Sequence, residues 1–296
     1  MEFEPRIYWC ADDFGLTAAS CDRILQCNKD GFLGRISVFP NSDVADLRDR
    51  IRNAGNANFG VHINLVEGKC VSDKSSLSLL VDGDGYFKKT YTGLLALSLS
   101  PKRKLFKKQL KTEIKAQIEK TISVFPDKTR IMLDSHQHTH TIPLVFSALS
   151  EVIEENGLEV GYIRTPAEPL SPFIKTPSLF GSYISVNLIK QWLINFFTLI
   201  NRGGIKKLGI PSACFFGIMF SGKMTEERVR KLLPAYVKYA KKRRCDIEIL
   251  FHPGYVDAGE ALRGFKFKKF YLSENRRREY DALRAFEKNR DFLNID

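Results

Sequence analysis

Short apolar runs rich in β-branched and aromatic residues recur along the chain, and longer stretches with helical spacing separate them. Runs of this length and composition predict buried β-strands. Seven such strands are predicted, at residues 6–11, 35–40, 58–65, 130–136, 160–166, 214–219 and 247–252.

The clearest helical pattern lies at residues 105–122, where an apolar side chain recurs every four residues from Phe106 to Ile122. This spacing places the apolar residues on one face of a helix. Repeated alternation of strand and helix predicts parallel strands joined by crossovers, because a hairpin cannot join parallel neighbours. A barrel and an open doubly wound sheet both satisfy this α/β pattern. No glycine-rich phosphate loop follows a predicted strand, which argues against dinucleotide or P-loop chemistry.

No internal repeat or low-complexity linker divides the chain, so one domain spanning residues 1–296 is expected. Two long irregular insertions are predicted at residues 69–100 and 168–212. Long connections in α/β enzymes usually cover a substrate or form a partner surface. The most apolar stretch, residues 184–200, contains Lys190 and several amide side chains and is too short and polar for a membrane span. It is interpreted as an amphipathic packing helix or a lid element.

The composition is ordinary for a globular protein, with 44% hydrophobic and 27% charged residues, which excludes disordered and collagen-like classes. The N-terminal sequence lacks the apolar stretch of a signal peptide. The six cysteines lack metal-ligand spacing, so reduced thiols in a cytoplasmic protein are expected.

The formal net charge is +12, and the basic residues are clumped, for example at 102–104, 241–244, 266–269 and 276–278. Such clumps are interpreted as solvated helix faces, with a basic rim that would favour an anionic small substrate. Because no nucleic-acid-binding motif accompanies them, no nucleic-acid partner is expected. No membrane partner is expected either, because the most apolar stretch is too short and polar for a span. A homodimer is compatible with the sequence.

All five histidines lie at or just beyond the end of a predicted strand: His62, His136, His138, His140 and His252. Acidic residues occupy the same kind of position, namely Asp12, Asp13, Glu67 and Asp134. The carboxyl ends of parallel strands share one face of the fold, where binding loops gather. Imidazoles and a carboxylate at one place suit a divalent transition metal, and Mg²⁺ if enough oxygens contribute. The pattern therefore predicts a catalytic metal site, whereas any one of these histidines alone would be read as a structural residue.

Local geometry leaves alternatives open. Asp12 and Asp13 would face opposite sides of a strand, unless the strand ends at Asp12 and the chain curls through the following turn. The same pair could instead cap the next helix. If residues 136–140 stay extended, their three histidines share one side, and if the strand ends near His136, only that residue is held rigidly. Asp134 is a candidate for orienting a ligand histidine, and Glu67 is expected to be a loop residue.

Five sequence blocks together resemble the YdjC-like carbohydrate deacetylases of the chitooligosaccharide deacetylase (ChbG/HpnK) type. The blocks occur in the family's order and extend from residue 11 to residue 255. They are ADDFG at 11–15, GVHINLVEG at 60–68, DSHQHTH at 134–140, IRTPAEP at 163–169 and FHPGY at 251–255. Residues 69–129 and 170–245 contain no matching block, and substrate choice is expected to lie there.

The resemblance implies a distorted TIM-like (β/α) barrel of the NodB-like superfamily, with about seven parallel strands. It also implies a metal-dependent hydrolase that removes acetyl from an N-acetylated sugar or oligosaccharide. Asp13, His62 and His136 would bind one Mg²⁺ or Zn²⁺ ion. Asp12 would be the general base and His252 the general acid.

The resemblance leaves the roles of His138, His140 and Arg164 unassigned. A phosphorylated sugar substrate is compatible with the basic surface. The rival functions are another metal-dependent amidohydrolase or phosphoesterase with a two-metal centre, and a basic binding protein without catalysis.

Overall fold

The computed structural model describes residues 3–55, 57–125, 130–183, 185–211, 213–260 and 262–289. All seven predicted strands are present. They are β1 (Ile7–Phe14), β2 (Arg35–Val38), β3 (Phe59–Ile63), β4 (Ile131–Ser135), β5 (Val160–Ile163), β6 (Cys214–Phe216) and β7 (Ile247–Phe251).

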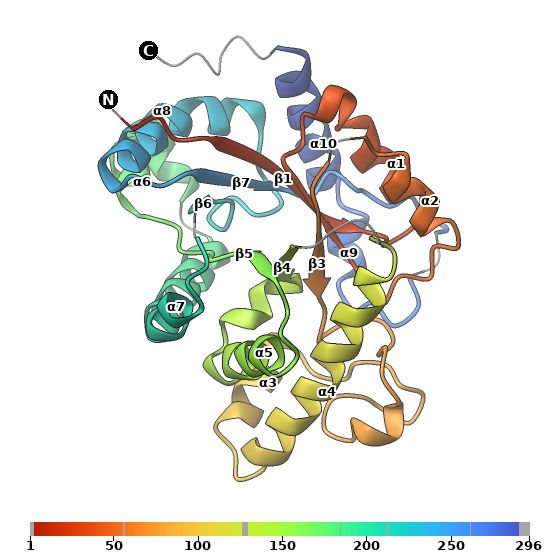
Figure 1. Cartoon of the computed structure of the whole chain (residues 1–296). Helices are drawn as coiled ribbons and strands as arrows, with labels where there is room; N and C mark the ends of the chain where they lie inside the picture. The colour runs from red at the N-terminus through yellow and green to blue at the C-terminus, as the bar shows by residue number, and fades with distance from the viewer. Residues whose placement is uncertain are drawn as a thin grey trace.

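The strands form one parallel sheet in the order β5-β4-β3-β2-β1-β7-β6. This is the cyclic order of a (β/α) barrel, interrupted only between β5 and β6, which are not paired with each other in the described part of the chain. The sheet therefore curls into a half-barrel with helices around it (Figure 1). Of the two architectures that the sequence allowed, the TIM-like one is confirmed.

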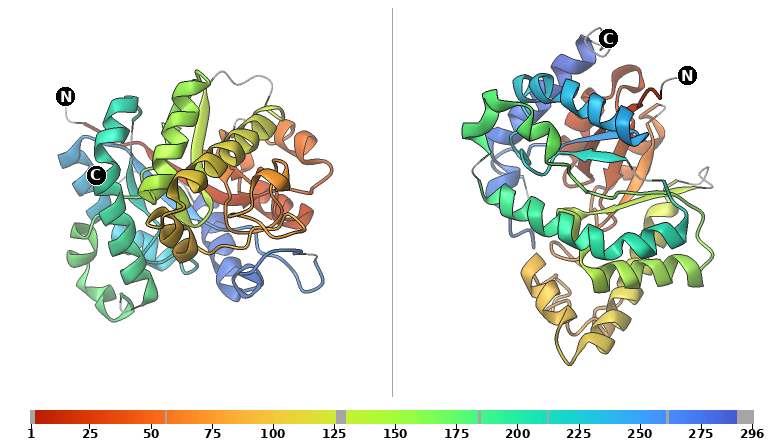
Figure 2. Two further views of the ribbon diagram at one scale, coloured as in Figure 1. Left: turned by 90° about the horizontal axis from the view of Figure 1, so that it is seen from below. Right: turned by 90° about the vertical axis from the view of Figure 1, so that its left-hand side faces the viewer.

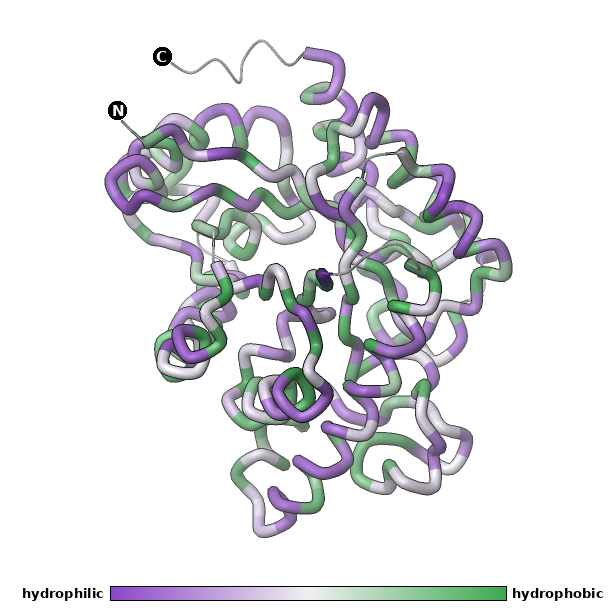
Figure 3. The backbone as a smooth tube through the Cα atoms, in the orientation of Figure 1, coloured by the Kyte–Doolittle hydropathy of each residue, from purple (hydrophilic) through white to green (hydrophobic). Residues whose placement is uncertain are grey.

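Helices cover the convex side of the sheet, and further helices lie at its open end. They are α1 (Ala18–Gln26), α2 (Leu47–Arg52), α3 (Tyr91–Ser98), α4 (Arg103–Ile122), α5 (Pro143–Glu155), α6 (Ser171–Ile174), α7 (Val186–Leu208), α8 (Glu226–Arg243), α9 (Lys268–Tyr271) and α10 (Glu274–Lys288). The predicted apolar face of α4 is buried from Phe106 to Ile118, and Ile122 is partly buried. Hydrophobic and hydrophilic residues alternate along such surface helices (Figure 3).

Hydrophobic side chains pack against both faces of the sheet. On the outer face, Trp9 of β1 and Phe251 of β7 stack in a cluster that includes residues of α8 and α10. On the inner face, Cys10 of β1 packs with Leu250 of β7 and with Ile194 of α7. Fully burying side chains of this size stabilises a fold by about 1.5–3 kcal/mol each. The strand ends that carry the candidate site are therefore rigidly supported.

The two long connections are more regular than predicted. The first contains a 3-10 turn at Lys74–Ser76 and α3, and two isolated bridges close it. The second contains α6, a 3-10 turn at Pro177–Ser182 and the 23-residue helix α7, which lies beside α5 (Figure 2). In the part of the chain that the structure describes, no helix has both the length and the hydrophobicity needed to cross a bilayer.

The ends of β1 and β4 decide the alternatives that the sequence left open. β1 does not end at Asp12 but continues to Phe14, with a shift in its register to β2 after Ala11. Asp13 has a φ of 70° within this irregularity, a left-handed conformation that redirects its side chain. β4 ends at Ser135, and His136–Thr141 form a 3-10 turn instead of an extended run. The three histidines of this segment therefore do not share one side.

Candidate active site

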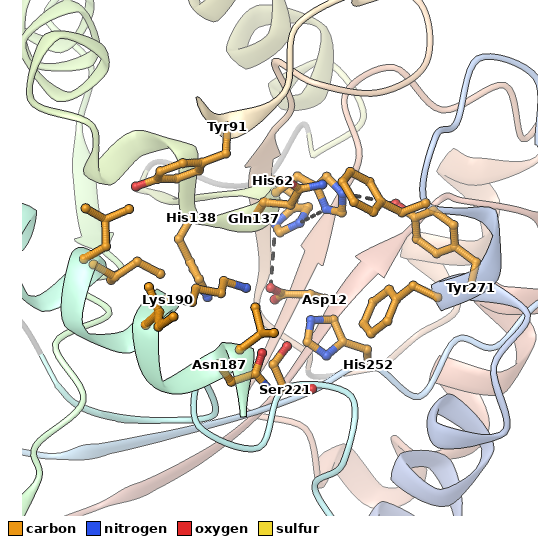
Figure 4. Close-up of a pocket in the computed structure, with 17 residues that line it drawn as sticks. Asp12, His62, Tyr91, Gln137, His138, Asn187, Lys190, Ser221, His252 and Tyr271 are labelled. Carbon is orange, nitrogen blue, oxygen red and sulfur yellow. Dashed lines mark hydrogen bonds and ion pairs between the residues drawn. The ribbon is translucent and has the colours of Figure 1, made fainter. Parts of the chain in front are cut away.

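A pocket of about 520 Å³ lies at the carboxyl ends of the strands. Its walls come from β1, β3, the 3-10 turn after β4, α7 and the segments that follow β7 (Figure 4). The lining residues include Asp12, His62, His136, His138, Lys190 and His252. Polar side chains from remote parts of the sequence thus converge, as their positions at strand ends predicted.

Asp13, His62 and His136 bring three donor atoms together. Asp13 Oδ1 lies 3.4 Å from His62 Nε2 and 3.2 Å from His136 Nδ1, and the two nitrogens are 3.4 Å apart. All three residues are buried, and Asp13 Oδ1 has no hydrogen-bond partner among the residues that the structure describes. Donor atoms at about 2.0–2.2 Å from one tetrahedral zinc ion lie about 3.3–3.6 Å from one another. The cluster therefore has the spacing to hold one divalent ion.

Two buried carboxylates fix the orientation of the histidines. His62 Nδ1 lies 2.6 Å from Asp134 Oδ1, and His136 Nε2 lies 3.0 Å from Glu67 Oε2. The second ring nitrogen of each histidine is thereby turned toward Asp13. Carboxylates that hold ligand histidines in this way are typical of metal sites, where they set the tautomer and the ring direction.

Glu67 is more important to this arrangement than the sequence suggested. It lies in the loop after β3, as expected, and its carboxylate is fully buried there. Besides His136, it accepts hydrogen bonds from the backbone N–H groups of Lys266, at 2.7 Å, and Phe267, at 2.8 Å, and from the hydroxyl of Tyr271. Glu67 thus ties the third strand's loop to the segment before α9. The sequence signals for this role were its position just beyond a predicted strand and its place within the GVHINLVEG block.

Arg276 of α10 is the partner of the remaining Asp13 oxygen. Its guanidinium is fully buried and donates to Asp13 Oδ2 and, at 3.1 Å, to the carbonyl of Gly254. Burial alone would raise the pKa of Asp13, but Arg276 and the two histidines hold that pKa well below its usual range. Asp13 is therefore an ionised carboxylate with one oxygen anchored and the other directed at the cluster. Sequence analysis did not reveal this contact, because Arg276 lies in a basic run that was interpreted as solvated.

Asp12 is held by Arg164. Two hydrogen bonds join them, Nη1 to Oδ2 at 2.7 Å and Nη2 to Oδ1 at 2.9 Å. Arg164 also lies 3.1 Å from Asp134 Oδ2 and donates to Glu248 Oε1 at 2.6 Å. Asp12, His62 and Asp134 form a second cluster close enough for a metal. Both oxygens of Asp12 already accept hydrogen bonds from Arg164, whereas Asp13 Oδ1 has no hydrogen-bond partner among the described residues, so a cation is better accommodated at Asp13, His62 and His136.

His252 faces the same pocket from the end of β7. Its Nδ1 lies 3.2 Å from Glu279 Oε2, and its backbone N–H donates to that oxygen at 2.6 Å. Glu279 is fully buried on α10, three residues after Arg276. One face of this helix therefore supplies the partners of both Asp13 and His252, which sequence reasoning did not foresee.

The other two histidines of the DSHQHTH block have different environments. His140 Nδ1 lies 2.5 Å from Ser135 Oγ and its Nε2 lies 2.9 Å from the carbonyl of Arg164, and burial lowers its pKa to about 4. His138 lines the pocket with its ring nearly perpendicular to that of Phe215, and burial lowers its pKa well below the usual value. His140 thus supports the backbone around the site, and His138 belongs to the pocket wall.

The charge balance favours a cation at the cluster. Burial alone would lower the pKa of His62, but the carboxylates of Asp12 and Asp134 outweigh it and raise the pKa to about 10. A buried group of carboxylates and imidazoles that binds protons so strongly also attracts a metal ion, which would replace those protons.

Curated proteins named carbohydrate deacetylase are similar to parts of the chain. The one from Thermoanaerobacter pseudethanolicus is 31% identical over 151 residues, which cover 51% of this chain and 57% of the relative. The one from Clostridium beijerinckii is 26% identical over 193 residues, covering 64% and 74%. The one from Danio rerio is 28% identical over 165 residues, covering 53% and 49%. The first and third alignments thus span only about half of the relative's length.

A solved structure from Enterococcus faecalis, a candidate cellobiose-phosphate cleavage protein, superposes with a TM-score of 0.64. It is 18% identical, and the match covers 96% of this chain and 95% of that one. At this identity the likeness concerns the fold alone. A family model described as YdjC-like protein matches residues 6–292. Because that match spans almost the whole sequence and includes every residue of the cluster, the chain belongs to the YdjC-like protein family.

Proposed function

We propose that the protein is a metal-dependent hydrolase that removes the acetyl group from an N-acetylated sugar or oligosaccharide. The observation that carries the proposal is the buried meeting of Asp13, His62 and His136 beside a pocket. The similarity to proteins named carbohydrate deacetylase supports the choice of substrate.

Amide hydrolysis needs a stronger nucleophile than water, stabilisation of the developing oxyanion and a proton for the departing amine. Asp13, His62 and His136 would hold one Mg²⁺ or Zn²⁺ ion. Such an ion supplies a Lewis acid that polarises the acetyl carbonyl and makes water easier to deprotonate. The remaining work falls to the side chains around it.

Asp12 is the proposed general base. It lines the pocket, and its Oδ2 lies 3.9 Å from Nδ1 of His62, so it is adjacent to the cluster without belonging to the set of Asp13, His62 and His136. The paired hydrogen bonds from Arg164 fix the direction of its carboxylate. A base held in this way can accept a proton from water without first reorganising.

His252 is the proposed general acid. An imidazole can carry a proton near neutral pH and release it to the amine nitrogen. Glu279 contacts Nδ1, so Nε2 is the ring nitrogen that would face the substrate. A correctly placed acid of this kind contributes about 10²- to 10⁴-fold in rate.

The pocket wall suits a sugar. Tyr91, Phe267, Phe270 and Tyr271 offer aromatic surfaces, and Asn187, Lys190 and Ser221 offer polar groups between them. Aromatic rings pack on the C–H faces of sugars, and the polar groups can bond hydroxyls. Lys190 also offers a positive charge, which is the feature of the pocket that favours a phosphorylated sugar.

Acetate release from a panel of acetylated mono- and oligosaccharides, plain and phosphorylated, tests the proposal. Turnover that a chelator abolishes and Mg²⁺ or Zn²⁺ restores is expected. Phosphate release in place of acetate release would instead indicate a phosphoesterase.

A further inference from the structure

Helix α7 presents an apolar face to solvent. Four of its large apolar side chains are largely exposed to solvent: Val186 at 81%, Ile189 at 73%, Trp192 at 69% and Leu199 at 64%. Phe196 and Ile200 are also exposed. Such a contiguous apolar surface on a folded protein usually marks a contact with another molecule. The helix faces the viewer in the right-hand view of Figure 2.

The inner face of α7 buries polar residues beside the apolar Ile194 and Phe197, whereas large apolar residues dominate its outer face, which is unusual for a packing helix. Gln191 and Asn201 are buried, and Thr198 is buried between them. Gln191 Nε2 donates to Glu168 Oε2 at 3.0 Å, and Asn201 Nδ2 donates to the carbonyl of Thr141 at 2.8 Å. These bonds fix the rotation of α7, so its apolar residues remain directed outward.

The apolar face continues into the mouth of the candidate active site. Val186 and Ile189 line the pocket while remaining largely exposed. Phe267 also lines the pocket and is exposed. Its neighbours Lys266, Lys268 and Lys269 are exposed as well, so this part of the rim combines an aromatic ring with three positive charges.

The charged residues of the segment that carries α7 have one sign, and one of them, Lys207, pairs with Glu154 of α5. No Asp or Glu occurs between Glu168 and Glu226, whereas six Lys or Arg do. An isologous contact with a second copy of the chain would bring these like charges together. An anionic bilayer surface attracts them, at about 1 kcal/mol for each basic residue near the surface.

We propose that α7 and Phe267 dock on an anionic lipid bilayer, with the pocket mouth at the membrane surface. Trp192 and its apolar neighbours enter the boundary between headgroups and acyl chains, and the flanking Lys and Arg side chains contact the headgroups. Because the inner face of α7 is bonded to the protein, the helix lies along the bilayer. This departs from the sequence-based expectation of no membrane partner. Docking does not depend on the reaction catalysed in the pocket, so it can fail or succeed independently of the proposed function.

Vesicle flotation of the full chain tests the proposal. One set of vesicles contains phosphatidylcholine alone, and the other contains about three parts phosphatidylcholine to one part phosphatidylglycerol. Binding to the second set, weakened by added salt, is expected. Fluorescence gives an independent reading, because Trp9 is buried and only Trp192 of the two tryptophans is exposed. A blue shift in emission on binding would report insertion of Trp192.

Two matched variants distinguish binding through the apolar face of α7 from a general effect of an added negative charge. Leu199 and Leu99 are both exposed leucines, but Leu99 follows α3 and lies outside the proposed surface. Leu199→Glu should lower the partition coefficient by about tenfold or more, because it removes apolar area and adds a negative charge at the interface. Leu99→Glu makes the same change of charge and should bind like the wild type.

Three results would overturn the proposal: no binding of the wild type to either set of vesicles, equal binding to both sets, or equal weakening by Leu199→Glu and Leu99→Glu. A dimer in sedimentation velocity without vesicles that Leu199→Glu dissociates would assign the face to a second copy instead.

Discussion

Arg276 donates a hydrogen bond to Oδ2 of Asp13, and this leaves Oδ1 of the same carboxylate facing His62 and His136. The two residues are 263 positions apart. The contact orients the carboxylate and supplies a positive charge that keeps it ionised.

Replacement of Arg276 should weaken metal binding and stability together. Arg276→Gln leaves a buried carboxylate without its charge partner, which costs about 3–5 kcal/mol of stability. Metal affinity should fall about 10- to 100-fold, as for other residues that orient ligands. Calorimetric metal titration and thermal denaturation measure the two effects. Arg277→Gln, at the half-exposed neighbour, is the matched control and should change neither. If Arg276→Gln does not fold, Arg276→Lys keeps the charge and should bind metal more weakly than the wild type.

Replacing a histidine of the cluster should reduce metal binding, whereas replacing a nearby histidine should not. His62→Ala and His136→Ala should each lower the bound metal and the activity in parallel, because each removes a ligand atom. Elemental analysis of dialysed protein measures the metal. His138→Ala should retain metal, since His138 lies in the pocket wall. Full metal content in both His62→Ala and His136→Ala would show that the ion binds elsewhere.

The proposed base and acid should be needed for turnover and not for metal binding. Asp12→Asn and His252→Ala should retain the metal but lower kcat by at least about 10²-fold. Glu279→Gln should lower kcat less and shift its pH profile, because Glu279 positions the ring of His252. Near-native kcat in His252→Ala would refute the assignment of the acid.

The burial of His140 should make the free energy of unfolding fall as the pH is lowered. Burial lowers its pKa to about 4, so the unfolded chain takes up a proton as the pH falls below 6.5 while the folded protein does not. Stability is therefore lost between pH 6.5 and about 4, by up to about 3 kcal/mol from this residue. His140→Gln can keep the bonds to Ser135 and Arg164 without titrating. Urea unfolding at several pH values should show a shallower acid loss for this variant, and identical slopes would contradict the prediction.

The strands and their converging ends were predictable, because local apolar runs and strand-helix alternation determine them. The convergence of Asp13, His62 and His136 was predictable for the same reason, since each lies at a strand end. Other histidines and acidic residues share that position, and only the family resemblance singled out these three as ligands. Their partners were not predictable. Arg276 and Glu279 contact the site only because one face of α10 packs on β1 and β7, and a local sequence pattern does not reveal which face that is.

Two further features escaped sequence reasoning because they depend on unusual local geometry. The left-handed backbone at Asp13 allows adjacent carboxylates to serve one site, where a regular strand would separate them. In α7 the apolar residues suggested inward packing, but Gln191 and Asn201 have buried partners and most of the large apolar residues face outward.

The central claim is that Asp13, His62 and His136 bind one divalent ion, and anomalous scattering from crystals grown with Zn²⁺ tests it most directly. One strong peak is predicted within bonding distance of Asp13 Oδ1, His62 Nε2 and His136 Nδ1. A peak between Asp12 and Asp134, or no peak at the cluster in crystals saturated with zinc, would contradict the account.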